Sequence, residues 1–345
     1  MLMVVFGAGA SYDSSSSFPL NRYPGDQGNN PYNDFDRPPL ANQLFEERPF
    51  FVALRERFPR CLAVVPYLQS LSRNIDVEHE LGKLQSESKK DPEVPKQLAA
   101  IRSYLEIMIW ECQRRWASRT HGVTNYNTIL NQIRQWKPPN EQVCLVTFNY
   151  DTLLEDALPK AGLRPLTLPD LVATDYKIIK LHGSISWARP VNTIIDSPEV
   201  FQNANALIER VSDLDIGSSY EIATQHPIAK SGNRAFVPAL AIPVETKTTY
   251  ECPKEHIDAL DEFLPKVTKL LLIGWRGTEA RFVKSLADNI LPGTQMMIVS
   301  SNAEKAHELA NNIRRDGVRA QYLPASNHGF TNFVIAREAD EFLER

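Results

Sequence analysis

Three short polar stretches have residue types suited to chemistry on a phosphorylated ligand. The first is Gly7-Ala8-Gly9-Ala10-Ser11, which follows an apolar run at 1–6. Small residues let backbone N–H groups approach an anionic phosphate closely, although an ordinary glycine-containing turn has the same composition. A dinucleotide fingerprint would add a third glycine and an acidic residue about 20 positions further on, and neither is recognisable here. The stretch therefore predicts either phosphate binding or a plain turn.

The second and third stretches contain Asn149, Asp151 and His182. The Asn149 amide donates and accepts hydrogen bonds without titrating, which suits it to orient a sugar hydroxyl or a water. The imidazole of His182, with an ordinary pKa of about 6.5, accepts a proton near neutral pH. Each residue also has a structural interpretation. Asn149 fits a turn, Asp151 fits the N-cap of the following helix, and His182 fits a hydrogen-bonded strand end.

The elements that must position these residues are short apolar runs that alternate with helical patterns. The runs lie at 1–6, 143–148, 177–187, 236–243, 269–275 and 295–300, and amphipathic patterns follow at 256–264, 279–290 and 303–315. Compact apolar runs suit central strands that are covered on both faces. Their alternation with helices predicts an α/β fold with a doubly wound parallel sheet.

Polar or glycine-containing clusters stand at or directly after the ends of four runs, and one cluster stands within the run at 177–187: Gly7–Ser11, Asn149–Asp151, His182-Gly183, Gly274-Trp275 and Ser300–Asn302. Ligands of parallel sheets bind at the C-terminal ends of the strands. We therefore expect these clusters to lie along one edge of the sheet and to form the ligand site.

The segment between the first and second strands has helical periodicity. Leu98, Ile101, Leu105, Ile109 and Cys112 recur at spacings of three and four, which predicts one apolar helix face. We expect a helical insertion at about 41–137 within a single domain spanning 1–345. The stretch 14–39, rich in Ser, Pro, Gly, Asn and Asp, predicts a long loop that is either functional or disordered.

Composition limits the functional classes. The formal net charge of −4 gives no basic excess, so nucleic acid is not an evident partner. The scattered cysteines, Cys61, Cys112, Cys144 and Cys252, form no Cys-x-x-Cys pair and predict neither a zinc ribbon nor a disulfide framework. No apolar run approaches the roughly 20 residues that cross a bilayer. We expect a cytoplasmic protein without a metal. The remaining histidines have no metal-ligand spacing and are expected at the surface or in loops: His79, His121, His226, His256, His307 and His328.

The motifs GAGAS, TFNYD, KLHGS and LLLIGWRGTEARF, in this order, resemble the sirtuin-like family, and within it the bacterial branch that hydrolyses NAD. The resemblance extends from Met3 to about Phe333, although residues 44–136 share only their helical character. It implies a Rossmann-like sirtuin fold, with NAD as the substrate and nicotinamide and ADP-ribose as the products. Because nicotinamide leaves as positive charge develops on the ribose, positioning and electrostatics can supply most of the catalysis.

The resemblance also implies roles for individual residues. It assigns catalysis to Asn149 and His182. It assigns cofactor-type contacts, on the pyrophosphate, beside the catalytic pair or on the adenosine half, to Gly7, Ala8, Gly9, Ser11, Asp151, Gly274, Trp275, Ser300 and Asn302.

The sequence departs from deacylating sirtuins after the Leu-His-Gly motif. Those enzymes have four zinc-binding cysteines there, whereas Cys252 alone follows His182 in this chain. An NAD-dependent deacylase, an ADP-ribosyltransferase and a non-catalytic nucleotide-binding sensor are the alternatives. The Pro-Asp-Phe-Arg motif of the family's nicotinamide loop has only a loose echo in Asn33-Asp34-Phe35-Asp36-Arg37, which is assigned no catalytic role.

Bacterial relatives of this type act in anti-phage defence by abortive infection, where NAD depletion stops the infected cell. Unrestrained hydrolysis would poison the host, so we expect the activity to be controlled. Because the chain ends at Arg345, soon after the last sheet element, a fused sensor is not expected. Control is expected from homo-oligomer formation or from a separately encoded activating protein, such as an ATPase or an Argonaute-like protein.

Overall fold

The computed structural model describes residues 1–14, 36–70, 77–88, 90–160, 167–193, 203–223, 225–226, 228, 230–231, 234–242, 250–325 and 328–344. The chain divides into two compact units. Unit 1 comprises Met1–Pro38, Gln113–Leu181 and Lys254–Arg345, and unit 2 comprises Pro39–Cys112 and His182–Pro253. The single domain at 1–345 and the boundaries of its helical insertion stay predictions.

Unit 1 is built on a six-stranded parallel sheet with the order β10-β9-β8-β1-β2-β3. Its strands are β1 (Leu2–Phe6), β2 (Val143–Thr147), β3 (Tyr176–Lys180), β8 (Lys269–Ile273), β9 (Gln295–Val299) and β10 (Gln321–Leu323). The chain moves outward from β1 through β2 to β3, then returns to β8 on the other side of β1. This is the doubly wound order, with its switch point between β1 and β8. The predicted fold class is confirmed.

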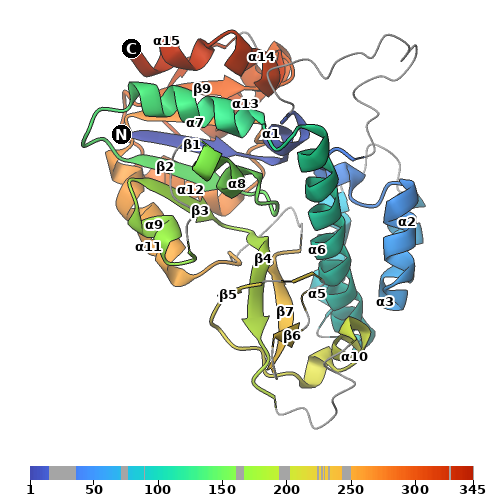
Figure 1. Cartoon of the computed structure of the whole chain (residues 1–345). Coiled ribbons are helices and arrows are strands. Elements are labelled where there is room, and N and C mark those ends of the chain that lie inside the picture. Colours follow the sequence, from blue (N-terminus) through green and yellow to red (C-terminus); the bar gives the residue numbers. More distant parts are fainter. Residues whose placement is uncertain are drawn as a thin grey trace, which may run out of the picture. The chain divides into compact units, whose positions relative to one another are not determined.

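The central strands are apolar because both of their faces are covered. Every residue of β1 and β2 is buried, and Val5 of β1 pairs with Val146 on one side and Leu272 on the other. Figure 1 shows β1 and β2 side by side within this sheet, with helices around it. Such continuous burial explains why these strands appear in the sequence as unbroken apolar runs.

The helices of unit 1 fall mainly between the strands along the chain. They are α1 (Ala8–Tyr12), α7 (Asn125–Trp136), α8 (Leu153–Lys160), α9 (Asp170–Ala173), α11 (Lys254–Phe263), the 3-10 turn η5 (Leu264–Lys266), α12 (Ala280–Asn289), α13 (Ala303–Arg315), α14 (Gly329–Ile335) and α15 (Glu338–Glu344). The amphipathic patterns at 256–264, 279–290 and 303–315 are thus confirmed as α11, α12 and α13, within a few residues at each end.

Unit 2 combines helices with a four-stranded antiparallel sheet of order β5-β4-β7-β6. Figure 1 shows β4 and β7 side by side. Its strands are β4 (Gly183–Pro190), β5 (Glu221–Ile222), β6 (Lys230–Ser231) and β7 (Arg234–Leu240). Its helical elements are η2 (Ala41–Gln43), α2 (Pro49–Glu56), α3 (Pro59–Leu62), α4 (Val65–Ser70), α5 (Val77–Glu87), α10 (Ala204–Glu209) and η4 (Val211–Asp213).

The long helix α6 (Glu93–Arg119) contains the predicted apolar stripe. All five stripe residues, from Leu98 to Cys112, are buried. Burial is wider than the stripe, because Tyr104, Glu106 and Met108 are buried too. A helix covered on more than one face is a core helix rather than a surface helix.

The prediction that residues 177–187 form one strand of the parallel sheet is wrong. The run divides after β3, and β4 begins at Gly183 in the antiparallel sheet. Gly183 has a φ of 82°, and a Cβ atom there would lie 2.0 Å from the carbonyl oxygen of Ala239. Only glycine allows the chain to turn this close to β7.

The prediction that residues 236–243 form a central parallel strand is also wrong. These residues lie largely in β7, whose partners β4 and β6 run antiparallel to it. Pro238 lacks the N–H that a regular ladder requires, and it pairs with Ala188 next to a register shift in β4. A proline inside the apolar run is therefore the signal that argues against a central parallel strand.

Candidate active site

Four of the five predicted clusters lie at the C-terminal edge of the unit 1 sheet. Gly7–Ser11 follows β1, Asn149–Asp151 follows β2, Gly274-Trp275 follows β8 and Ser300–Asn302 follows β9. All of these strands are parallel, so their C-terminal ends share one edge. His182 follows β3 by two residues along the chain and belongs to unit 2.

The glycines of the first turn pack against the turn after β8. A Cβ atom on Gly7 would lie 2.6 Å from the Gly274 carbonyl oxygen, and one on Gly9 would lie 2.9 Å from the Gly274 Cα. Gly274 itself has a φ of 59°, and its Cβ would lie 2.3 Å from the Ala10 nitrogen. Close backbone packing at the switch point therefore accounts for these glycines without any ligand.

The same packing uses several N–H groups of the turn. Gly7 donates to the Ile273 oxygen, Gly9 donates to the Gly274 oxygen, both at 3.0 Å, and Ala10 donates to the Gly7 oxygen at 2.9 Å. Ala8 is the first residue of α1, where a helical N–H has no acceptor within its own helix. Among the four residues of the predicted phosphate contact, Ala8 has the N–H best placed by helix geometry to meet an anion.

Asn149 fastens this turn to the end of β2. Its Nδ2 atom donates to the Gly7 oxygen and to Ser11 Oγ, both at 3.0 Å, and to the Tyr126 hydroxyl at 3.1 Å. A carbonyl oxygen only accepts, so the side-chain atom that faces Gly7 must be the amide nitrogen. The amide hydrogens are thus committed to the protein. Oδ1 is the Asn149 atom that can accept a hydrogen bond from a ligand.

Tyr126, Ser11 and Asp151 continue this hydrogen-bonded chain. The Tyr126 hydroxyl lies 2.8 Å from Ser11 Oγ, and the Ser11 hydroxyl also bonds to the Asp151 carboxyl. Because an ionised carboxylate only accepts, Ser11 donates to Asp151, and Tyr126 in turn donates to Ser11. All four residues are buried. The resulting donor order, Asn149 to Tyr126 to Ser11 to Asp151, fixes the orientation of the Asn149 amide.

Asp151, which follows β2, and Lys180, at the end of β3, place charged groups at this edge of the sheet. Asp151 Oδ1 accepts from the Leu153 N–H at 3.1 Å, which is the predicted capping of α8. The Lys180 side chain is fully buried, and its Nζ donates to the Asp151 carbonyl at 2.6 Å and pairs with Glu155 at 2.8 Å. Burial raises the pKa of Asp151, and the positive charge of Lys180 opposes that rise. Lys180 therefore stabilises the turn after β2 through its bond to the Asp151 carbonyl and its ion pair with Glu155.

Trp275 packs inside unit 1. Its ring stacks on Phe148 with the centroids 5.8 Å apart and the planes at 10°, and Phe282 meets it edge-on. Its Nε1 donates to Glu279, and the residue is 6% exposed. Phe148 covers one ring face, and the predicted contact of Trp275 with adenosine stays a prediction.

Ser300 and Asn302 stand where β9 gives way to α13. Asn302 is the N-cap of α13, and its side chain accepts from the Lys305 N–H at 2.8 Å. The Ser300 carbonyl accepts from the Gly329 N–H at 2.9 Å. Both residues therefore have structural roles, and their contacts with a nucleotide stay predictions.

His182 is buried at the start of unit 2. Its backbone carbonyl accepts from the Ala241 N–H at 3.0 Å, and the turn at Gly183 follows it directly. The histidine is thus fixed by the backbone of β4 and β7. The convergence of Asn149 and His182 on one ribose stays a prediction, because the two residues belong to different units.

The motif echo at Asn33–Arg37 is described only in part, since residues 33–35 lie outside the described residues, as does most of the predicted loop at 14–39. Asp36 pairs with Arg115 at 3.4 Å and with Arg119 at 2.8 Å. The Arg37 guanidinium lies over the rings of Tyr12 and Trp116, at 4.9 and 5.2 Å from their centroids. These contacts bind Asp36 and Arg37 to α1 and to the C-terminal part of α6.

Sequence reasoning missed Tyr126 and Lys180. Tyr126 lies in a helix, far along the chain from the residues it bonds, so no local pattern marks it. Lys180 ends the apolar run Ile178-Ile179, where a lysine is ordinarily exposed, so the sequence does not show that this one is buried and paired.

The expectation that the remaining histidines lie at the surface or in loops is wrong for His256, which lies in α11. His256 is 1% exposed, and its Nδ1 accepts from the Lys180 N–H at 3.1 Å. Burial, helped by the charge of Lys180, lowers the pKa of His256 to about 4. His226 bonds to the buried Glu106 and stacks on Trp110. Tertiary packing, which spacing along the chain does not reveal, buries the His256 imidazole, whereas His226 lies in a loop as expected.

In the described part of the chain, no group of three or more His, Cys, Asp and Glu side chains is arranged to hold a metal ion. The four cysteines are buried with free thiols. Among the helices within the described ranges, none is both long enough and apolar enough for a membrane crossing.

Comparison with known proteins gives one family match. Residues 143–227 match the family described as SIR2-like domain, a stretch that contains Asn149, Asp151 and His182. A search among curated proteins gave no match.

Several solved structures are similar to this chain. A Sir2 homologue mutant in complex with ADP-ribose has a TM-score of 0.40 and 13% identity, covering 99% of this chain and 90% of its own. A Sir2 homologue in complex with NAD has a TM-score of 0.39 and 12% identity, covering 99% and 87%. Sir2Tm bound to a propionylated peptide has a TM-score of 0.40 and 10% identity, covering 99% and 94%.

Proposed function

We propose that this chain is an NAD glycohydrolase, which converts NAD and water into nicotinamide, ADP-ribose and a proton. The observation that carries the proposal is the oriented amide of Asn149. Its nitrogen is committed to Gly7, Ser11 and Tyr126, which leaves Oδ1 to accept from a ligand at the edge where parallel sheets bind ligands. The SIR2-like match over 143–227 contains this residue.

The proposed chemistry requires little from titratable groups. The bond between nicotinamide and the ribose breaks as positive charge develops on the sugar, and a water forms the new bond to the same carbon. Asn149 Oδ1 orients the water or a ribose hydroxyl by accepting its hydrogen, and His182 takes the proton. The buried Asp151 carboxylate adds negative potential beneath the developing charge.

The remaining predicted contacts belong to the rest of the nucleotide. In this proposal the pyrophosphate lies at the turn Gly7–Ser11, where the Ala8 N–H is the donor that helix geometry leaves for it. Gly7 and Gly9 keep the turn close to Gly274, and the Ser11 hydroxyl positions Asp151 and Tyr126. The adenosine half lies toward Gly274-Trp275 and Ser300–Asn302.

Nicotinamide release from NAD by the purified chain tests the proposal. We expect release by the wild type and a loss of at least about a hundredfold in Asn149→Ala and in His182→Ala. Asn311→Ala and His307→Ala, which change the same residue types on the exposed surface of α13, are the matched controls. Undiminished release from Asn149→Ala, with the controls also active, would contradict the proposal.

The same preparation discriminates the alternatives. An NAD-dependent deacylase would release nicotinamide only together with an acylated peptide, and an ADP-ribosyltransferase would attach labelled ADP-ribose to protein. A nucleotide-binding sensor would bind NAD without turnover. Free ADP-ribose formed without any peptide favours the hydrolase.

We further propose that the activity serves bacterial anti-phage defence in the cytoplasm through abortive infection. This setting follows from the family resemblance alone. It requires restraint of the enzyme, by homo-oligomer formation or by a separately encoded activator such as an ATPase or an Argonaute-like protein. Measuring nicotinamide release against protein concentration, with and without candidate activators, tests that restraint.

A further inference from the structure

Unit 2 contains a cavity of about 160 Å³. Its walls come from α6, β4, β7, α10 and η4, all of which belong to unit 2. Most of the described lining residues are apolar, and they include Leu207, Ile208, Val211, Ile228 and Phe236. Because an apolar cavity of about 150 Å³ holds a molecule the size of benzene, this one has room for a single six-membered ring.

The apolar walls have packing partners of their own. Leu207 belongs to a buried cluster with Val191 and Ala235, and Phe236 belongs to another with Ile228. The backbone of Ile228 is fixed as well, because its N–H donates to a buried carboxylate of α6 at 3.2 Å. These contacts need no occupant, so the walls are in place before a ligand enters.

Helix α10 is joined to its neighbours by residues that do not line the cavity. Glu209, at its C-terminal end, bonds twice to Arg60 of α3 at 2.6 Å and lies 3.8 Å from Lys96 of α6. Asn205 donates to the Arg57 carbonyl at 2.9 Å. The position of the α10 wall therefore does not depend on contacts across the cavity.

The charged side chains of the lining have partners in the protein. Arg189 Nε donates to the Gly217 carbonyl at 2.9 Å, and a terminal nitrogen of Arg189 lies 3.5 Å from the Glu251 carboxylate. Arg102 Nε donates to the Leu240 carbonyl at 3.1 Å. Since an ion would have to give up its water and compete with these contacts, an uncharged occupant suits this lining better.

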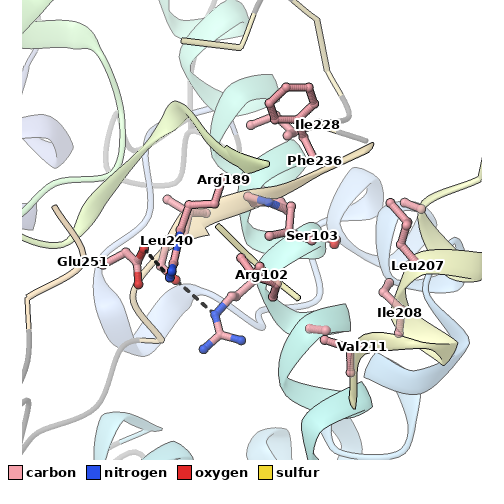
Figure 2. A pocket seen from close by; sticks show the side chains of 15 residues that line it. Arg102, Ser103, Arg189, Leu207, Ile208, Val211, Ile228, Phe236, Leu240 and Glu251 are labelled. Atoms are coloured by element: carbon pink, nitrogen blue, oxygen red, sulfur yellow. Dashed lines mark hydrogen bonds and ion pairs between the residues drawn. The ribbon is translucent and has the colours of Figure 1, made fainter. Parts of the chain in front are cut away.

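Ser103 of α6 is the remaining polar side chain of the described lining. It is 5% exposed, and none of the described residues forms a hydrogen bond with its hydroxyl. Figure 2 shows Leu207, Ile208 and Val211 on one side of Ser103 and the charged residues on the other. A buried hydroxyl without a hydrogen bond raises the free energy of the folded chain, and a bond from an occupant would remove that cost.

We propose that this cavity binds a small uncharged molecule with one six-membered ring and one hydroxyl group, of which phenol is a simple example. The ring lies among Leu207, Ile208 and Phe236, and the ligand hydroxyl forms a hydrogen bond with Ser103 Oγ, which can both donate and accept. Ser103 is the specificity-determining residue, because it separates a ring that has a hydroxyl from one that has none. This site is independent of the proposed hydrolysis of NAD.

Titration of the full chain with phenol and with toluene, followed by NMR, tests the proposal. The two molecules have the same shape and differ by a hydroxyl in place of a methyl group. We expect phenol to bind with a Kd on the order of 1 mM or tighter. No binding of phenol up to about 10 mM overturns the proposal.

Ser103→Ala tests the hydrogen bond. It should weaken phenol binding at least about fivefold and leave toluene binding within about twofold, because only phenol loses a partner. A general disturbance of the fold would weaken both ligands, so the toluene measurement separates the two causes. Equal changes for the two ligands, or no change for phenol, overturn the role of Ser103.

Further variants locate the site. Ser86→Ala removes the same atom from an exposed serine on α5 of the same unit, and this matched control should bind phenol as the wild type does. Ala204→Phe places a ring in the cavity and should abolish binding of both ligands. Phenol should shift the methyl resonances of Leu207 and Ile208. Shifts confined to other residues, or undiminished binding by Ala204→Phe, overturn the assignment.

Discussion

The sheet edge of unit 1 and the cavity of unit 2 are built in opposite ways. After β1 and β8 the backbones approach so closely that added Cβ atoms would lie within 3 Å of them, and the polar side chains there bond to one another. In unit 2 a pocket of about 160 Å³ lies between α6, α10 and β7, and its lining includes Arg102, Leu207 and Phe236. The first region holds atoms in fixed positions without spare room, and the second leaves space between its elements.

The difference matters for what each region can do. A catalytic amide must be held in one orientation, and a closed network of hydrogen bonds gives that at the cost of tolerance to change. A pocket wall borders open space, so an added side chain can enter that space without displacing the backbone. Substitutions at the sheet edge should therefore be costly, and substitutions at the cavity wall should be mild.

Lys180→Met should cause the largest loss. It removes the fully buried ammonium group, leaving the half-buried Glu155 carboxylate without its cation and the Asp151 carbonyl without its donor. Breaking a buried ion pair on one side costs about 3–5 kcal/mol, which urea denaturation monitored by circular dichroism will measure.

The matched control is Lys284→Met, which breaks an exposed pair with Asp288 on α12. Its cost should be below about 0.5 kcal/mol. Similar losses for the two lysines would show that Lys180 does not hold the edge.

Gly274→Ala tests the close approach at the switch point. A Cβ there would lie 2.3 Å from the Ala10 nitrogen, on a backbone with a φ of 59°. The clash and the strained angle together should cost about 3 kcal/mol. Thermal unfolding will record the loss.

Gly293→Ala separates strain from clash. Gly293 has a φ of 95° but no atom within 4 Å of an added Cβ. Only strain remains, so this variant should lose about 1 kcal/mol. If both variants lose the same amount, the contact between the two turns is not what requires glycine.

The sequence predicted the sheet edge well because the signal is local. The runs at 1–6, 143–148, 269–275 and 295–300 are buried on both faces, so each appears as continuous apolar residues, and the residue that follows is at the edge by geometry. The sequence predicts phosphate binding by Gly7 and Gly9. In the structure, however, both must be glycine because the backbone of Gly274, more than 260 positions away, lies against them. Their type was visible in the sequence, but their partner was not.

Unit 2 could not be predicted in the same way. Its sheet pairs β4 with β7 across about fifty residues, and a register shift beside Pro238 removes the regular alternation that marks an antiparallel strand. Tyr126 and His256 act through contacts that form only in the folded chain. Arg102 belongs to an ordinary helical pattern, and the space beside it has no counterpart in sequence.

Titration of His256, which accepts a hydrogen bond from Lys180, should make the stability of unit 1 depend on pH. Its pKa is about 4 in the folded chain against an ordinary value near 6.5, so between these values the unfolded chain binds a proton that the folded chain does not. Stability is therefore fully present above about pH 6.5 and falls as the pH drops toward 4, by up to about 3 kcal/mol.

His256→Asn removes this titration and keeps an acceptor for the Lys180 N–H. Between pH 6.5 and 4, its free energy of unfolding should change less steeply than that of the wild type. Urea denaturation at several pH values gives both slopes. Parallel slopes would mean that the buried histidine does not contribute to the acid sensitivity of the edge.

A smaller effect than that of Lys180→Met or Gly274→Ala should come from one substitution, Ala→Leu, made once in each region. Ala10 is fully buried against the Gly274 turn, whereas Ala204 lines the cavity. Three added carbons at Ala10→Leu must displace packed backbone and should cost about 1–3 kcal/mol. At Ala204→Leu the same atoms enter existing space, so the loss of packing is absent and the change should stay within about 1 kcal/mol, in either direction. Thermal unfolding of the two variants compares them directly. A larger loss at Ala204 than at Ala10 would mean that the cavity wall is as rigid as the sheet edge, and the distinction between a region built for position and a region built for space would not hold.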